Sequence, residues 1–173
     1  MFFVTSINNI MKILFIQTGG TIDKDYPKQS KGYAFEINEP AVKNILKKIN
    51  PSFEFEILPL MKKDSLDIKT ADRKKLLDAC KKNSASKIII THGTDTIIET
   101  AKYLSGIKNK AIILTGSFKP EKFKDSDADF NIGLAIGAVS VLKTGVYIAM
   151  NGRVFEFGKV VREKISGKFN SRL

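Results

Sequence analysis

The sequence predicts an α/β fold, in the form of a three-layer α/β/α sandwich with a mostly parallel sheet and a single domain. Apolar segments of strand type alternate with segments of helical periodicity along the chain. Several of the strand segments are apolar throughout, which is typical of strands buried on both faces. The length of 173 residues suits one domain with a substantial core, and 43% hydrophobic with 27% charged residues indicates a globular chain.

The first third of the chain predicts two strands and a helix. Residues 12–17 are an apolar first strand. Residues 18–38 form a loop whose final part alternates and can belong to a small hairpin, and a loop of this length in a compact domain is usually functional. Residues 40–49 form a short helix that starts at a proline. Residues 53–58 alternate between apolar and polar side chains, as a strand does.

The middle third repeats this alternation. Thr70 has the residue type of an N-cap for a helix over residues 71–82. Residues 87–91 read Lys-Ile-Ile-Ile-Thr and predict a central strand. Residues 95–105 carry apolar positions at helical spacing, and residues 111–114 are a further buried strand.

The last third completes the sheet. Residues 128–142 are small and apolar and predict a buried helix, and residues 146–150 predict the last parallel strand. Residues 154–157 can return as a short hairpin partner. The basic, polar tail beyond them is expected to extend over the surface.

Two strands end in similar threonine turns. The first strand runs into Thr18-Gly19-Gly20-Thr21, and the strand over residues 87–91 runs into His92-Gly93-Thr94. Glycine lets the backbone turn sharply and lets a ligand approach the main chain. Ligands of parallel α/β sheets collect at the carboxyl ends of the strands. Thr21 and Thr94 are therefore candidates for a nucleophile and its proton-handling partner.

The side chains around these turns permit amide chemistry. A threonine hydroxyl attacks a carbonyl carbon only when its proton is removed or its oxygen is made more basic. Tyr26 or Tyr33, both in the long loop, could reach such a hydroxyl. Asp95 could hold a substrate ammonium, and the N–H group of Thr94 could help to bind an oxyanion.

A serine-hydrolase triad is the competing arrangement. His92, the one histidine, could be combined with Ser117 and Asp95. The sequence lacks the nucleophile-elbow pattern of such enzymes, so a structural, hydrogen-bonded His92 is favoured.

The charge does not favour a nucleic-acid interface. The net charge is +11, from 29 Lys and Arg against 18 Asp and Glu. The lysines come as scattered pairs on predicted helix faces and ends, without interleaved aromatics or a recognition module. We interpret them as solvated helix surface, whose positive field can attract an anionic or zwitterionic substrate.

Membrane, metal and secretory interpretations have little support. No apolar run approaches the roughly 20 residues that span a bilayer, so no membrane association is expected. Residues 1–10 lack the basic start of a secretory signal, and we interpret them as an extension, non-native or ill-ordered, before a domain over residues 11–173. Cys80 alone cannot form an internal disulfide, which fits the cytoplasm, and it is expected to be buried. No cluster has metal-ligand spacing, and no cofactor is expected.

Taken together, the two turns resemble those of the bacterial L-asparaginase/glutaminase family of threonine amidohydrolases. Residues 18–22 look like the family's first active-site signature, and residues 91–96 with 99–101 look like its second. Residues 64–67, Asp-Ser-Leu-Asp, are similar to its substrate-carboxylate loop. The resemblance continues through residues 114–117 and Asn131, and it runs in order from about Lys12 to Phe169.

The resemblance implies catalytic roles for particular residues. Thr21 would be the nucleophile that forms an acyl-enzyme and expels ammonia. Thr94 would be the second catalytic hydroxyl, and Asp95 would bind the substrate α-ammonium. Tyr26 would be the lid phenol, with Tyr33 as the less favoured candidate.

The resemblance also implies substrate contacts. Ser65 would bind the substrate α-carboxylate through its hydroxyl and backbone. Asp64, Gly20, Gly93 and Ser117 would line the same site. Paired charges and donors around the head group are what a free amino acid needs.

The sequence departs from the family in two respects. The family's lysine after the last strand aligns with Arg162, and Lys164 lies two residues further on. An arginine cannot act as a base, so either Arg162 has a purely electrostatic role or Lys164 does this work, which we slightly favour. The chain also ends before the family's second, smaller domain, so we expect a short, one-domain form with a more open site and weaker affinity.

We therefore expect a cytoplasmic L-asparagine amidohydrolase that forms L-aspartate and ammonia and assembles as a homodimer or homotetramer. Specificity between asparagine and glutamine cannot be read from the sequence, because one methylene is worth only about 1–3 kcal/mol. The alternatives are an amidohydrolase for another small ω-amide, a catalytically weak amino-acid-binding domain and, with less support, a nucleic-acid binder.

Overall fold

The computed structural model describes residues 11–27 and 35–172. The extension predicted over residues 1–10 and the candidate Tyr33 lie outside the described residues.

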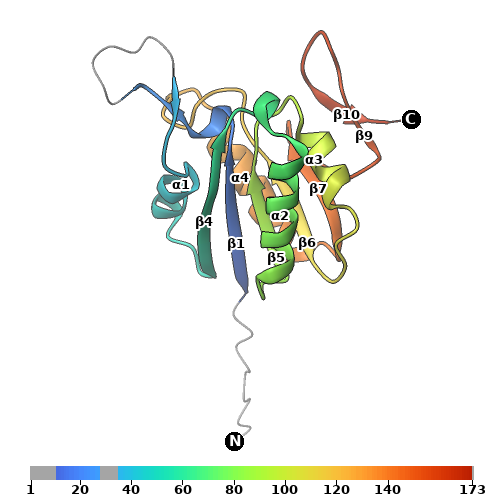
Figure 1. The fold of residues 1–173 in the computed structure, drawn as a ribbon. Helices are drawn as coiled ribbons and strands as arrows, with labels where there is room; N and C mark the ends of the chain where they lie inside the picture. The colour runs from blue at the N-terminus through green and yellow to red at the C-terminus, as the bar shows by residue number, and fades with distance from the viewer. Residues whose placement is uncertain (1–10, 28–34, 173) are drawn as a thin grey trace, which may run out of the picture.

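The described residues form one six-stranded sheet in the order β4-β1-β5-β6-β7-β8 (Figure 1). The first five of these strands are parallel to one another, and β8 is antiparallel to β7. This confirms the mostly parallel sheet. The strands are β1 (Lys12–Gly19), β4 (Glu54–Lys63), β5 (Lys87–Thr91), β6 (Ala111–Thr115), β7 (Gly145–Met150) and β8 (Arg153–Glu156).

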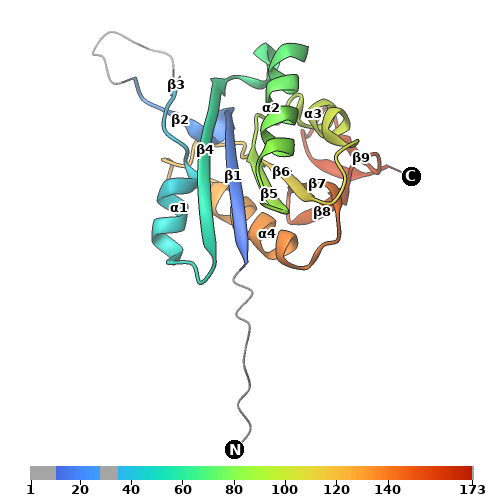
Figure 2. The same cartoon turned by 60° about the horizontal axis from the view of Figure 1, so that its bottom comes forward.

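Helices cover both faces of this sheet, which confirms the three-layer α/β/α sandwich (Figures 1 and 2). Helices α2 and α3 pack on one face, and α1 and α4 pack on the other. The four helices are α1 (Val42–Ile49), α2 (Thr70–Lys82), α3 (Ile97–Leu104) and α4 (Ala128–Val141).

The apolar strands are buried because successive side chains go to opposite helical layers. Leu14 and Ile88 pack with α2 and α3, whereas their neighbours Phe15 and Ile89 pack with α1 and α4, and all four are fully buried. A strand with helices on both sides has no polar face, which explains the uninterrupted apolar runs in the sequence. Cys80 lies in the α2 layer and is buried, as predicted.

Strand β4 is longer than predicted. It continues beyond Leu58 through Pro59 to Lys63. Proline has no N–H group to donate to a neighbouring strand, which would leave a gap in the hydrogen bonds of a central strand. Strand β4 tolerates it because it is an edge strand, paired only with β1. The extension matters because it carries β4 to the carboxyl end of β1, where Gly19 pairs with Lys63.

Helix α2 starts one residue earlier than predicted. Thr70 is its first residue and Lys69 is the N-cap, so the expected role of Thr70 was wrong. The carboxylate of Asp72 accepts a hydrogen bond from the Lys69 N–H at 2.9 Å. This acidic side chain three residues after the N-cap satisfies a donor at the helix start.

Two small two-stranded ribbons complete the fold. The β2–β3 ribbon pairs β2 (Lys24–Asp25) with β3 (Glu36–Ile37), so the described part of the predicted hairpin is present. The C-terminal hairpin pairs β9 (Val160–Arg162) with β10 (Phe169–Ser171). The tail was expected to extend over the surface, but Phe169 is only 1% exposed and fixes the hairpin to the core.

Candidate active site

The turn after β1 has a backbone conformation that requires glycine. Gly19 and Gly20 have φ angles of 110° and 86°, and Gly20 leads directly into a 3₁₀ turn, η1 (Thr21–Asp23). The N–H group of Gly20 donates to the carbonyl oxygen of Lys63 at 2.9 Å, which holds the turn against the end of β4. Thr21, which follows, is partly exposed.

The turns after β1 and β5 are in backbone contact. A Cβ atom added to Gly20 would lie 2.4 Å from the Cα atom of Gly93. Two backbone segments can approach each other this closely only where both residues lack a side chain. Because Thr21 follows Gly20 and Thr94 follows Gly93, the structure brings the two threonine turns together at the carboxyl ends of β1 and β5.

The loop after β4 reaches the same point. A Cβ atom added to Gly93 would lie 2.6 Å from the Oγ atom of Ser65. Thr96 donates through its hydroxyl to the carbonyl oxygen of Ser65 at 2.8 Å. Ser65 is 1% exposed, and its own hydroxyl has no hydrogen-bond partner among the described protein atoms. A buried hydroxyl in this state has hydrogen-bonding capacity left for a ligand.

Asp64 connects this loop to the β2–β3 ribbon. Its carboxylate accepts from the ammonium of Lys24, with an Nζ–Oδ2 distance of 2.8 Å, and from the N–H group of Leu66. The hydrogen bond from Lys24 is the main reason that the pKa of Asp64 lies below its ordinary value. Asp64 therefore supports the Ser65 loop and the ribbon together.

The exit of β6 adjoins the second threonine turn. A Cβ atom on Gly116 would lie 3.8 Å from the Cγ2 atom of Thr94 and 2.2 Å from the carbonyl oxygen of His92. Ser117 is buried next to Gly116, and its hydroxyl donates to the carbonyl oxygen of Lys119. The hydroxyl of Ser117 is thus engaged within its own loop.

The second turn also meets the C-terminal hairpin. Arg162 forms an ion pair with Asp95 through its Nη1 atom, and its Nε atom donates to the carbonyl oxygen of Gly167 at 3.2 Å. The guanidinium carbon lies 5.9 Å from the centre of the Phe118 ring. Lys164 is exposed in the segment between β9 and β10. The structure therefore brings Arg162 into direct contact with Asp95.

His92 has a structural environment. It is fully buried, with its Nδ1 atom 2.8 Å from the carbonyl oxygen of Gly93 and its Nε2 atom 2.9 Å from the hydroxyl oxygen of Thr100. A carbonyl oxygen can only accept, so Nδ1 carries the proton and Nε2 accepts from Thr100. Burial lowers the pKa of His92 to about 4, and the ring is neutral at pH 7. Both ring nitrogens are occupied, which agrees with the structural role expected for His92.

Tyr26 directly follows β2 of the β2–β3 ribbon and is 71% exposed. Its ring centre is 5.2 Å from that of Phe35, which in turn lies 5.8 Å from that of Phe123 in the loop after β6. The aromatic contacts of Tyr26 are thus with the ribbon itself.

Sequence reasoning overlooked Asp23 and Lys24. Asp23 is 3% exposed although it is an acid in a turn, and Lys24 pairs with Asp64. Nothing in the sequence marks Asp23 as buried. Its position two residues after Thr21 was the available signal that it lies near the site, although not that it is buried.

Residues 11–27 and 35–172 contain no group of three or more His, Cys, Asp or Glu side chains placed to hold a metal ion. Over the same residues, none of the helices has the length and apolar character required to cross a bilayer.

Comparison with known proteins identifies the family. The family model described as Asparaginase, N-terminal, matches residues 12–169. The chain belongs to the asparaginase family. Its fold is similar to part of the thermostable L-asparaginase from Thermococcus kodakarensis, with a TM-score of 0.79 and 27% identity over 93% of this chain and 51% of that one.

The curated relatives of this asparaginase-family chain are described as more than one kind of protein. A glutaminase-asparaginase from Acinetobacter glutaminasificans is 36% identical over 45% of this chain and 25% of its own length. A glutamyl-tRNA(Gln) amidotransferase subunit from Methanococcus vannielii is 32% identical over 84% of this chain and 35% of its own length. The matched part is thus a quarter to about a third of these relatives and about half of the structural neighbour.

Proposed function

We propose that this protein hydrolyses the side-chain amide of L-asparagine to give L-aspartate and ammonia. The observation that carries the proposal is the backbone contact of Gly20 with Gly93, which puts the turns of Thr21 and Thr94 side by side. Membership of the asparaginase family supports amide hydrolysis as the reaction class.

In the proposed mechanism, the Oγ atom of Thr21 attacks the amide carbon of the substrate. The resulting oxyanion is stabilised by donors of the Thr94 turn. The carbon–nitrogen bond then breaks, and the nitrogen leaves as ammonia with the proton that Thr21 gave up. Water attacks the acyl ester, its hydroxyl completes the product carboxylic acid, and its remaining proton returns to Thr21.

The substrate head group would be bound by the residues around the two turns. The unpartnered, buried hydroxyl of Ser65 is suited to donate to the α-carboxylate. Asp95 supplies an anion for the α-ammonium, although one of its oxygens pairs with Arg162. Asp64 keeps the Ser65 loop in place, and the glycines at 20 and 93 let the substrate approach the backbone.

The role of the family's lysine goes to Arg162 or to Lys164. The ion pair with Asp95 supports Arg162 in an electrostatic role, since its guanidinium stays charged. An Arg162→Ala change would then reduce ammonia release by more than about tenfold, whereas Lys164→Ala would leave it nearly unchanged. The opposite order would assign the role to Lys164.

A second candidate function is ammonia release from a different amide. The similarity to an amidotransferase component over 84% of this chain favours it. Glutamine, or a glutamine-type amide presented by a partner protein, would then be the substrate. A catalytically weak amino-acid-binding domain remains the non-enzymatic alternative to both.

Steady-state ammonia release from asparagine and from glutamine tests these functions. Replacing Thr21 by Ala should lower the rate by at least about a hundredfold, because the hydroxyl proposed to attack the amide carbon is removed. Thr144, an exposed threonine in the segment between α4 and β7, provides the matched control, and Thr144→Ala should leave the rate of ammonia release unchanged. Turnover that survives in Thr21→Ala would refute the proposed nucleophile. Binding without turnover in the wild type would favour the non-enzymatic alternative.

The cytoplasmic location and the homodimer or homotetramer stay predictions. Light scattering coupled to gel filtration would give the oligomeric state, and a monomer at micromolar concentration would contradict the prediction.

A further inference from the structure

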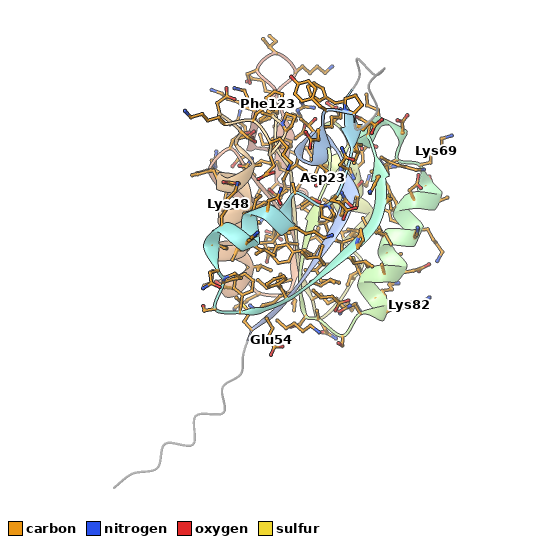
Figure 3. All side chains as sticks on the ribbon, turned by 90° about the vertical axis from the view of Figure 1, so that its left-hand side faces the viewer. Asp23, Lys48, Glu54, Lys69, Lys82 and Phe123 are labelled. Carbon is orange, nitrogen blue, oxygen red and sulfur yellow. The ribbon has the colours of Figure 1, made fainter. Side chains whose placement is uncertain are left out.

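Asp23 has an unusual environment for a carboxyl group. It closes η1 two residues after Thr21 and is only 3% exposed. Aspartate is rarely buried to this extent without a paired charge. Asp23 lies at the same end of the sheet as Phe123 and at the opposite end from Glu54, the first residue of β4 (Figure 3).

Asp23 joins three segments through hydrogen bonds. Its N–H group donates to the carbonyl oxygen of Gly20 at 3.2 Å, which closes the Thr21 turn. Its own carbonyl oxygen accepts from the N–H group of Asn38 at 2.9 Å, just beyond β3. Its Oδ1 atom accepts from the N–H group of Ala41, the N-cap of α1, at 2.8 Å. The threonine turn, the base of the β2–β3 ribbon and the start of α1 therefore meet at this residue.

The other carboxyl oxygen is left without a hydrogen bond. The Oδ2 atom of Asp23 is buried and has no partner among the described protein atoms. Gln17 at the end of β1 and Thr91 at the end of β5 are the polar side chains that favour its ionised form. The hydroxyl oxygen of Thr91 is likewise buried without a hydrogen-bond partner among the described protein atoms, so Thr91 does not complete a hydrogen bond to Asp23. An ionised carboxylate would need more donors than these.

The surrounding charges do not replace the missing donors. Lys62 of β4 is a cation that favours the ionised form of Asp23, but its effect is small and it is exposed. Burial outweighs these contributions and raises the pKa of Asp23 to about 7. A cavity of about 200 Å³ that Asp23 helps to line also has charged residues of both signs in its wall. They are Lys24, Asp25, Glu39, Lys43, Glu121 and Lys122.

We propose that Asp23 is a positioning residue, whose buried carboxyl group clamps the Thr21 turn and the β2–β3 ribbon to the start of α1. It acts through Thr21 and touches no substrate itself. The inference rests on the proposed amide hydrolysis for its catalytic part, but the clamp itself can be measured without activity. The protonated carboxyl keeps Oδ1 as the acceptor for Ala41 and leaves no charge buried, so holding the clamp closed costs least with the proton bound.

The test compares Asp23→Ala and Asp23→Asn with Asp78→Asn, which changes a partly exposed aspartate on α2. Amide hydrogen exchange is measured at Asn38 and Ala41, with the strand β6 as internal reference. Asp23→Ala should raise exchange most at Ala41, whose N–H group loses its acceptor, less at Asn38, whose acceptor is the retained backbone carbonyl, and should leave β6 unchanged. It should also lower kcat for ammonia release by about tenfold or more, with a smaller change in KM, because small misplacements of a nucleophile are costly.

The conservative variant supplies a readout that a merely structural residue would not move. Asparagine keeps an acceptor for the Ala41 N–H and is always neutral. The ratio of kcat for Asp23→Asn to kcat for the wild type should therefore rise severalfold between about pH 5.5 and pH 8, as Asp23 ionises in the wild type. The ratio for Asp78→Asn should stay constant.

Four results decide the inference. Unchanged exchange at Ala41 in Asp23→Ala would overturn the clamp. Faster exchange with an unchanged kcat would overturn the positioning role. If Asp23→Ala does not fold, a pH-independent ratio for Asp23→Asn would overturn it instead. A wild type that releases no ammonia from either amino acid would reject the proposed function and the catalytic part, while the exchange data would still decide the clamp.

Discussion

Exchanging single glycines for alanine tests the contact on which the site depends. The same methyl group is added at Gly20, Gly93 and Gly137, and the structure predicts a different result at each position. At Gly137, in the interior of α4, an added Cβ atom would meet nothing within 4 Å among the described atoms. Alanine there should stabilise the protein by about 0.5–1 kcal/mol, because glycine loses more backbone entropy on folding.

Gly20→Ala combines two costs. The residue has φ 86° and ψ −175°, a region occupied essentially by glycine, and other residues there cost about 1–3 kcal/mol. The added Cβ atom would also lie 2.4 Å from both the Cα and N atoms of Gly93, which are backbone and cannot turn aside. Overpacking adds about 1–3 kcal/mol, so the total loss should be roughly 2–6 kcal/mol out of the 5–15 kcal/mol typical of a domain.

Gly93→Ala has only the steric cost. The φ angle of Gly93 lies outside the left-handed region, and its new Cβ atom would meet the Oγ and Cβ atoms of Ser65 at 2.6 and 2.7 Å. The loss should be about 1–3 kcal/mol. Removing the Ser65 side chain in a Gly93→Ala/Ser65→Gly double variant should recover part of it, with a coupling energy of about 0.5–3 kcal/mol.

Urea unfolding at constant pH, followed by circular dichroism, measures these differences. The expected order of stability, from the most to the least stable protein, is Gly137→Ala, wild type, Gly93→Ala, Gly20→Ala. A Gly20→Ala protein as stable as the wild type would refute the backbone contact, and with it the convergence of the two threonine turns. Strictly additive effects of the Gly93 and Ser65 changes would refute the contact between these residues.

Three further predictions concern charge and burial. Burial raises the pKa of Asp23 from 3.8 to about 7. Its contribution to the unfolding free energy is therefore full below about pH 4 and declines as the pH rises to about 7, by at most roughly 4 kcal/mol. Thermal melts at several pH values should show this decline in the wild type and not in Asp23→Asn. Arg162→Lys should keep more ammonia release than Arg162→Ala because it keeps a cation next to Asp95, and equal losses would show that the planar guanidinium is required. The thiol of Cys80 is buried with a pKa raised to about 12, so it should react with a disulfide reagent only on unfolding, and rapid labelling of the native protein would contradict its burial.

Much of the fold follows from local patterns in the sequence. The segments over residues 87–91 and 111–114 are too apolar for any surface and too short for buried helices, so they predict central strands. The threonine turns were recognisable because glycine at the end of a strand allows a sharp turn of the backbone. What the patterns could not show is that Gly20 touches Gly93, since this contact depends on the order of the strands in the sheet.

Other parts of the site depend on tertiary contacts that leave no local signal. Asp23 has the sequence context of an exposed turn residue, and its burial results from the packing of the ribbon and α1 around it. Phe169 is a lone aromatic residue in a basic tail, yet it inserts into the core and brings Arg162 to Asp95. Pro59 is tolerated in β4 because of the strand's edge position, which is a property of the complete sheet.

The placement of Arg162 outside the main sheet has a consequence for synthesis and quality control. Every strand of the six-stranded sheet lies before residue 157, so a ribosome delivers the whole scaffold before it delivers the cation that faces Asp95. A chain that has not yet folded the C-terminal hairpin can therefore hold its complete sheet while its charge arrangement is still incomplete. A defect at Arg162 alone, whose side chain is not part of the hydrophobic core, would escape expression yields and melting curves and would show only as lost turnover.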